Sequence, residues 1–103
     1  MKYKNRKTAC YDSTKEKRRA DVLKLLQLQG IISDLHEQVR FELIPAQYEN
    51  GKCVERECFY VADFVYTEKG NRIVEDVKGF KTPDYIIKRK LMLEKHGIKV
   101  KEV

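Results

Sequence analysis

The chain has 103 residues, of which 37% are charged and 42% hydrophobic, and its formal net charge is +6 with a pI near 9.2. This length gives room for one small domain, and the composition excludes a disordered chain. The positive charge favours a polyanionic partner, either nucleic acid or an anionic membrane surface. No apolar run approaches the roughly 20 residues of a membrane helix, and no apolar segment follows the basic N-terminus, so we expect neither a membrane span nor a secretory signal.

The first third of the chain predicts a basic arm followed by one helix. Residues 1–12 show little periodicity, and we expect a flexible arm ahead of a single domain over 13–103. Ser13 and Glu16 have the Ser-x-x-Glu spacing of a capping box. Apolar residues follow at helical spacing, with Val22 and Leu25 among them, until Gly30. We therefore predict a helix over 14–29, followed by a connector over 31–37.

The rest of the chain predicts three strands, a second helix and a last strand. Alternation over 39–44 ends at Pro45, and Asn50-Gly51 is a strong hairpin signal. Further strands are predicted over 55–66, 72–78 and 98–103, with a helix from Pro83 to His96 before the last of them. The order of the elements predicts a mixed sheet with helices against it, an α/β or α+β domain.

The two strands around Lys69-Gly70 bring acidic residues together. If the hairpin turn is centred on this dipeptide, Val65 opposes Val74 and Asp63 opposes Asp76. Directly opposed residues have Cβ atoms roughly 4.5–5.5 Å apart, and two carboxylates that close repel unless a cation lies between them. Mg²⁺ prefers oxygen ligands and commonly binds one or two carboxylates plus a phosphate. The hairpin therefore predicts a metal site.

Lys78 is expected to share this site, because residues two apart on a strand point to the same face as Asp76. A lysine beside a metal can orient water or stabilise charge on a phosphate. The alternative is a structural role, in which Lys78 forms a salt bridge with the aspartates. Glu75 lies on the opposite face, and we interpret it as structural or solvent-exposed unless the register shifts by one residue.

Order and motif together resemble the PD-(D/E)XK nuclease superfamily, which has the restriction-endonuclease-like fold. Its core is a helix, three strands, a helix and a strand, with one acid on the second strand and an acid-x-lysine on the third. Asp63 and Asp76-Val77-Lys78 match these positions, and Glu16 matches a glutamate that many members add from the first helix. The resemblance implies catalytic Glu16 and Asp63 beside the third-strand motif, and metal ligation by the three acids and the main-chain carbonyl of Val77. Ala62 stands where the superfamily pattern often has proline.

Several stretches also look like a family of small phage and prophage proteins carried as a domain of unknown function. This likeness implies a phage-encoded protein in the cytoplasm of a bacterial host, with a phage recombination or packaging protein as a partner. The stretches are Lys2-Tyr3-Lys4-Asn5, Ser13-Thr14-Lys15-Glu16, Leu23-Lys24-Leu25-Leu26-Gln27, Gln38-Val39-Arg40-Phe41-Glu42-Leu43-Ile44-Pro45, Tyr60-Val61-Ala62-Asp63-Phe64 and Val74-Glu75-Asp76-Val77-Lys78-Gly79.

For the other polar residues, a structural role competes with a functional one. Glu16 completes a helix cap whether or not it binds metal. A charge run is usually a solvated face, but the basic start of the first helix would flank the proposed site. We interpret Tyr60 and Tyr66 as core or sheet-face residues. The candidates for nucleic-acid contact are Lys15, Lys17, Arg18, Arg19, Gln38, Lys81 and Lys88.

Cysteine usage agrees with a cytosolic protein. The three cysteines, Cys10, Cys53 and Cys58, are an odd number without zinc-site spacing, and we expect reduced thiols. A disulfide between Cys53 and Cys58 is the alternative.

The sequence thus predicts a Mg²⁺-dependent DNA endonuclease, with Mn²⁺ as a substitute metal. So small a domain leaves little room for base reading, so we expect a homodimer and a branched substrate such as a Holliday junction; that substrate rests on fold-level analogy. Two alternatives stay open. One is a catalytically silent nucleic-acid-binding protein with the same fold, and the other is a protein-interaction module.

Overall fold

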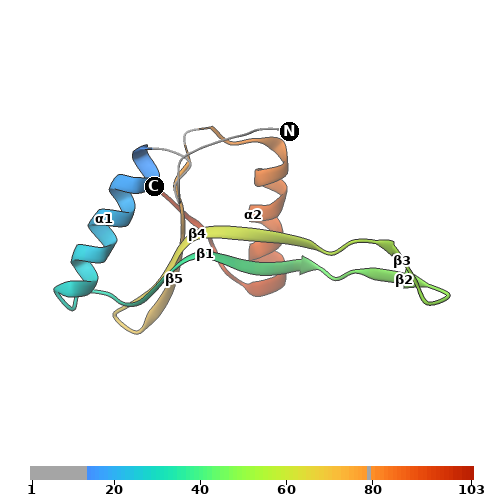
Figure 1. The fold of residues 1–103 in the computed structure, drawn as a ribbon, viewed down its shortest axis with the longest axis horizontal. Helices are drawn as coiled ribbons and strands as arrows, with labels where there is room; N and C mark the ends of the chain where they lie inside the picture. The colour runs from blue at the N-terminus through green and yellow to red at the C-terminus, as the bar shows by residue number, and fades with distance from the viewer. Residues whose placement is uncertain (1–13, 79) are drawn as a thin grey trace.

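The computed structural model describes residues 14–78 and 80–103, so the N-terminal arm, Ser13 and Cys10 lie outside the described residues. Its main sheet has the strand order β1-β4-β5-β6, in which β6 runs parallel to β5 and the other neighbours are antiparallel. Strands β2 and β3 form a separate two-stranded sheet. The expected α+β class, with a mixed sheet flanked by helices, is confirmed (Figure 1). The elements are α1 Thr14–Leu28, β1 Ser33–Ile44, β2 Gln47–Glu49, β3 Lys52–Glu55, β4 Cys58–Glu68, β5 Asn71–Asp76, α2 Pro83–His96 and β6 Lys101–Glu102.

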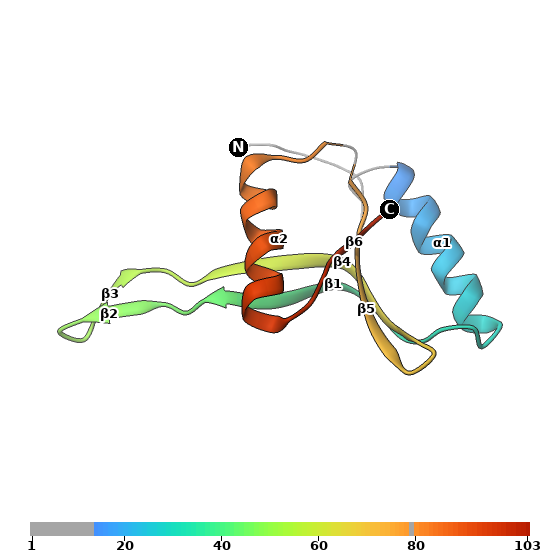
Figure 2. The same ribbon diagram turned by 180° about the vertical axis from the view of Figure 1, so that it is seen from behind.

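The two helices lie on opposite sides of the sheet, and each covers its own apolar cluster (Figures 1 and 2). On the α1 side, Ala20 and Leu23 pack against Phe64 and Tyr66. On the α2 side, Tyr85 and Met92 belong to a larger cluster with residues of β1, β4 and β5. The buried members of that cluster are Phe41, Leu43, Tyr60, Ala62, Val65, Val74, Tyr85, Met92 and Val100.

The alternation of side chains along strand β4 is interrupted at Asp63, so even-numbered residues point toward α2 before it and toward α1 after it. Before this residue, Tyr60 and Ala62 pack in the α2 cluster; after it, Phe64 packs in the α1 cluster although it lies two residues beyond Ala62. Ideal alternation would keep all three on one face. Asp63 therefore occupies the point where the two cores meet.

Strand β1 makes the same change at Gln38. Leu35 packs with the α1 cluster, whereas Val39 and Phe41, at the same alternation, pack with the α2 cluster. Gln38 has a φ of 55°, in the left-handed region that non-glycine residues seldom adopt. The pairs on either side of it, Glu37 with Phe64 and Val39 with Ala62, bring Gln38 opposite Asp63.

A long β-hairpin extends away from the helices, shown in green at one end of Figure 1. We call residues 45–57, between the end of β1 and the start of β4, the β-arm. Its turn has Asn50 at a φ of 53° and Gly51 at 81°, as the Asn-Gly pair requires in a tight hairpin turn. The predicted hairpin at this dipeptide is confirmed.

Helix α2 runs from Pro83 to His96 as predicted, and α1 differs from its predicted bounds by one residue. Four strand predictions were wrong in extent. Residues 33–37 continue β1 where a connector was expected, the strand over 55–66 is interrupted at Arg56 and Glu57, the strand over 72–78 ends at Asp76, and the final strand shortens to β6. Leu35 explains the first error, because it reaches the α1 cluster from a segment whose polar composition resembles a loop.

Helix α1 buries a different face from the one that its apolar pattern suggested. Ala20 and Leu23 are fully buried, whereas Val22 and Leu25 are 45% and 54% exposed. The alternative of a disulfide between Cys53 and Cys58 was wrong, because both residues are free thiols. Among the described residues, no helix is long and apolar enough to cross a membrane.

Candidate active site

The hairpin between β4 and β5 places Asp63 beside Asp76. Its turn has Lys69 and Gly70 at φ values of 51° and 80°, and Val65 pairs with Val74 as predicted. The same register, continued past Phe64 and Glu75, brings the two aspartates opposite each other. The neighbouring Asp63 carboxyl is one of the causes that raise the pKa of Asp76.

Asp76 is a buried carboxyl group whose ionisation is disfavoured. Only 2% of its surface is exposed. Burial and the neighbouring Asp63 carboxyl raise its pKa to about 7, and a hydrogen bond from Tyr60 and the charge of Lys78 oppose this rise. The Tyr60 hydroxyl donates to Oδ2 of Asp76 at 2.5 Å. The structure thus holds two adjacent carboxyl groups, of which one resists becoming charged.

Asp63 is partly exposed and held from both sides. The backbone N–H of Val77 donates to its Oδ2 at 2.9 Å, and the Gln38 amide lies 3.5 Å from its Oδ1. This contact with Val77 anchors Asp63 to the segment that carries the Asp76-Val77-Lys78 motif.

Lys78 lies against both the acidic pair and helix α2. Its Nζ is 3.7 Å from Oδ2 of Asp76 and 4.5 Å from the centre of the Tyr85 ring. Its side chain is 29% exposed, so it is neither fully buried nor free in solvent. A lysine held in this way has its charge placed beside the carboxylates and close to solvent.

Gln38 connects Asp63 with Glu16 of α1. Its Nε2 donates to Oε2 of Glu16 at 3.0 Å, and the same nitrogen makes the 3.5 Å contact with Asp63. Glu16 is 4% exposed, so a carboxylate from the first helix is buried near the acidic pair. The left-handed backbone of Gln38 is an energetic cost of a kind that clusters at functional sites.

Five predicted residues therefore gather in one place: Glu16, Gln38, Asp63, Asp76 and Lys78. The described residues contain no group of three or more His, Cys, Asp or Glu side chains already arranged to hold a metal ion. Glu16 meets the amide of Gln38 in this arrangement. The oxygen donors that face each other directly are those of Asp63 and Asp76, which is a donor set that suits a hard cation such as Mg²⁺.

A cleft of about 300 Å³ opens over these groups. Its walls include Gln38, Asp63, Asp76 and Lys78, with Lys88 contributed by α2. Lys15 reaches the same region, because its Nζ donates to the main-chain oxygen of Lys78 at 3.4 Å. Two of the basic residues predicted to contact nucleic acid thus border the acidic pair.

Three other residues that were predicted to contact nucleic acid lie away from the acidic pair. Lys17 pairs with Asp21 at 3.6 Å on the exposed surface of α1. Lys81 pairs with Glu102 at 3.1 Å, and Arg18 is exposed on α1. These three residues lie outside the walls of the cleft.

Arg19 and Glu75 form an ion pair on the α1 side of the sheet, in which Glu75 is fully buried and Arg19 is partly buried. Arg19 donates from Nε at 2.9 Å and from Nη2 at 2.6 Å, one bond to each carboxylate oxygen. Tyr66 also donates to Glu75. Burial alone would raise the pKa of Glu75, but these hydrogen bonds outweigh it and hold the pKa below its ordinary value. Glu75 is thus a structural residue, and it is fully buried, not solvent-exposed.

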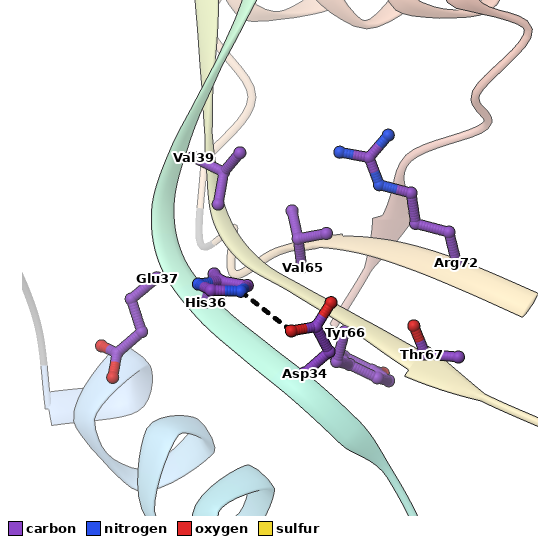
Figure 3. Close-up of a pocket in the computed structure, with 8 residues that line it drawn as sticks. All are labelled: Asp34, His36, Glu37, Val39, Val65, Tyr66, Thr67 and Arg72. Atoms are coloured by element: carbon purple, nitrogen blue, oxygen red, sulfur yellow. Dashed lines mark hydrogen bonds and ion pairs between the residues drawn. The ribbon is translucent and has the colours of Figure 1, made fainter.

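A larger depression, of about 380 Å³, lies at the other end of the β1–β4 pair (Figure 3). His36 and Asp34 contact each other there at 3.1 Å, and Arg72 lines the wall. The side chains of His36 and Asp34 are 64% and 75% exposed. This solvated pair has none of the burial that perturbs Asp76, so the smaller cleft is the better candidate site.

Residues 1–102 match the family model described as a protein of unknown function, DUF1064. The chain belongs to this family. No curated protein and no solved structure matches the chain.

Tyr60 belongs to the site, although its sequence pattern does not predict this role. An aromatic residue in an apolar strand indicates core packing, and its ring does pack in the α2 cluster. Its hydroxyl, however, reaches across to Asp76 of the neighbouring strand because β4 changes face at Asp63. No local sequence signal marks that change.

Proposed function

We propose that this protein is a metal-dependent endonuclease that hydrolyses phosphodiester bonds in DNA. The observation that carries the proposal is the pair of adjacent carboxyl groups, Asp63 and Asp76, with Lys78 beside them in an open cleft. Two carboxyl groups this close are costly unless they share a proton or a cation. A raised pKa in a cleft, caused by burial and a specific neighbour, is typical of functional sites.

Asp63 and Asp76 would hold Mg²⁺, or Mn²⁺ in its place, and such an ion lowers the pKa of water and polarises a phosphate. Glu16 would act through Gln38, whose amide it binds. Tyr60 fixes the orientation of Asp76 by its hydrogen bond. These contacts hold the acidic pair on the sheet rather than on a flexible loop.

Lys78 would stabilise negative charge that develops on the phosphate during hydrolysis. Its Nζ is fixed between Asp76 and the Tyr85 ring, so its charge need not be reorganised during the reaction. Lys88 on the cleft wall and Lys15 beside it supply positive charge for neighbouring phosphates. The net charge of +6 adds attraction for the DNA backbone that weakens with salt.

One observation favours a second function, a DNA-binding protein without turnover. The described residues hold two facing aspartates and no ready group of three metal-binding side chains. A site that binds phosphates through its lysines but holds metal poorly would bind DNA without cutting it.

A cleavage assay separates the two functions. Labelled linear duplex, single-stranded, flap and four-way-junction DNA would be incubated with Mg²⁺, Mn²⁺ or EDTA. We expect cutting that requires the metal, with the preferred DNA identified by its rate. Salt-sensitive binding without cutting of any substrate would instead support the non-catalytic function.

A further inference from the structure

The β-arm carries apolar side chains that nothing in the described chain covers. All residues of β2 and β3 are exposed, with Tyr48 at 67% and Val54 at 53%. Neither α1 nor α2 lies against the β-arm in either view (Figures 1 and 2). A two-stranded hairpin with nothing packed against it is marginally stable in water. Contact with a partner would therefore stabilise the β-arm.

Helix α1 also exposes an apolar face, on the side away from the sheet. Val22, Leu25 and Leu28 follow one another at a spacing of three residues and are 45%, 54% and 86% exposed. Residues at this spacing lie close together on a helix surface. The buried residues Ala20 and Leu23 define the opposite side, which packs on the sheet. Single exposed apolar residues are ordinary, but a row of three on one face indicates a contact surface.

The charges around the two surfaces are complementary. The β-arm has three acidic residues, Glu49, Glu55 and Glu57, against two basic ones, whereas α1 has five basic residues against two acidic ones. The acidic excess makes the β-arm a poor surface for a nucleic-acid backbone. It suits an apolar surface with basic residues around it, and the outer face of α1 has both properties.

The two surfaces lie at opposite ends of the molecule (Figures 1 and 2). If two copies lie side by side in opposite directions, the β-arm of each one lies at the end of the other copy that carries α1. A two-fold axis relates the two contacts, so the assembly is closed.

We propose that the protein forms a dimer in which the β-arm of each copy packs on the outer face of α1 of the other copy. The dimer does not depend on the proposed nuclease activity, because none of the residues in this contact belongs to the acidic site. It gives a function to two exposed apolar surfaces that the single chain leaves uncovered.

Sedimentation velocity over a range of protein concentrations tests the dimer, with three variants at exposed positions. Tyr48→Asp changes the β-arm, Leu25→Asp changes α1, and Ile87→Asp is a matched control on α2, where Ile87 is 59% exposed. We expect the wild type and the control to dimerise alike. Each of the two interface variants should weaken the dimer by roughly tenfold or more, which is the size of effect of a central interface residue. Circular dichroism would check that every variant is folded.

Mixing the two interface variants distinguishes this arrangement from others. In a mixed dimer, the intact β-arm of the Leu25→Asp chain meets the intact α1 of the Tyr48→Asp chain, so one of the two contacts is restored. The mixture should therefore dimerise more strongly than either variant alone. Contacts between two β-arms or between two α1 helices would leave one variant unaffected and would give no restoration. Either result, or a wild type that stays monomeric, overturns the proposal.

Discussion

The hydroxyl of Tyr60 donates a hydrogen bond of 2.5 Å to Oδ2 of Asp76, across two strands that do not pair at that point. Tyr60 is 3% exposed and Asp76 2%, so this bond is made away from water. It is one of the interactions that oppose the raised pKa of Asp76. The phenol therefore favours the ionised carboxylate that a metal site needs.

Replacing Tyr60 by phenylalanine should weaken both stability and function. Tyr60→Phe removes a hydrogen bond to a buried carboxyl group, which costs about 1–3 kcal/mol of unfolding free energy. It should also raise the pKa of Asp76 further, so the acid limb of the pH–rate profile should move to higher pH. Tyr48→Phe is the control, because Tyr48 is 67% exposed on the β-arm. An unmoved profile in Tyr60→Phe would contradict the assigned contact.

Replacing Asp76 by asparagine should stabilise the metal-free protein in a pH-dependent way. The folded-state pKa of about 7 lies above the ordinary 3.8, so the stability tied to the proton is present below pH 3.8 and lost as pH rises through 7. Asp76→Asn escapes this loss. The pKa difference corresponds to about 4 kcal/mol as an upper estimate. Thermal melts in EDTA should show a larger advantage of Asp76→Asn at pH 8 than at pH 5; an equal advantage at both would contradict the raised pKa.

Replacing Glu75 by glutamine should have the opposite pH dependence. The pKa of Glu75 is held low, so its ionised form stabilises the fold above the ordinary pKa and that stability is lost as pH falls through the folded-state value. Breaking its buried pair with Arg19 should cost about 3–5 kcal/mol near neutral pH. Urea unfolding at pH 7 and pH 4 measures this, with a smaller cost expected at pH 4. The fraction of Glu75→Gln that stays folded should still bind metal, because residue 75 points to the α1 side of the sheet, away from the acidic pair.

Replacing Glu16 by glutamine should reduce metal affinity more than stability. Glutamine keeps an oxygen that can accept from Gln38, so the contact that now measures 3.0 Å survives while the charge is lost. Loss of a partner that orients a metal site typically reduces metal affinity 10–100-fold. Calorimetric titration with Mn²⁺ and a thermal melt would be compared with the wild type. A large fall in melting temperature with unchanged metal affinity would mean that Glu16 serves only the helix.

The β4–β5 hairpin was predictable because its turn chemistry and alternating pattern agree. Lys69-Gly70 fixes the turn and the turn fixes the register, so the opposition of Val65 to Val74 followed from the sequence. Helix α2 was equally clear, because Pro83 begins it and Gly97 ends it.

The rest of the site depends on long-range packing that leaves no local pattern. Gln38 and Asp63 lie where both strands exchange faces, and this exchange is set by two cores closing on one sheet. It brings Tyr60 to Asp76 and Gln38 to Glu16, two contacts that strict alternation does not predict. The buried face of helix α1 was predicted wrongly for a related reason. The helix is apolar on two sides, and only packing against the sheet determines which side is buried.

The most direct test of the proposed nuclease site is the Mg²⁺-dependent cleavage rate of three proteins on the DNA that the wild type cuts best. They are the wild type, Asp76→Asn and Asp34→Asn; the last is a matched control in an exposed residue whose φ of 57° asparagine also tolerates. We predict metal-dependent cutting by the wild type and by Asp34→Asn, and a loss of at least roughly 100-fold in Asp76→Asn, as expected when a metal-binding carboxylate is removed. Equal rates in all three proteins, or no metal-dependent cutting by the wild type, would contradict the assignment of Asp63 and Asp76 as the site of a nuclease.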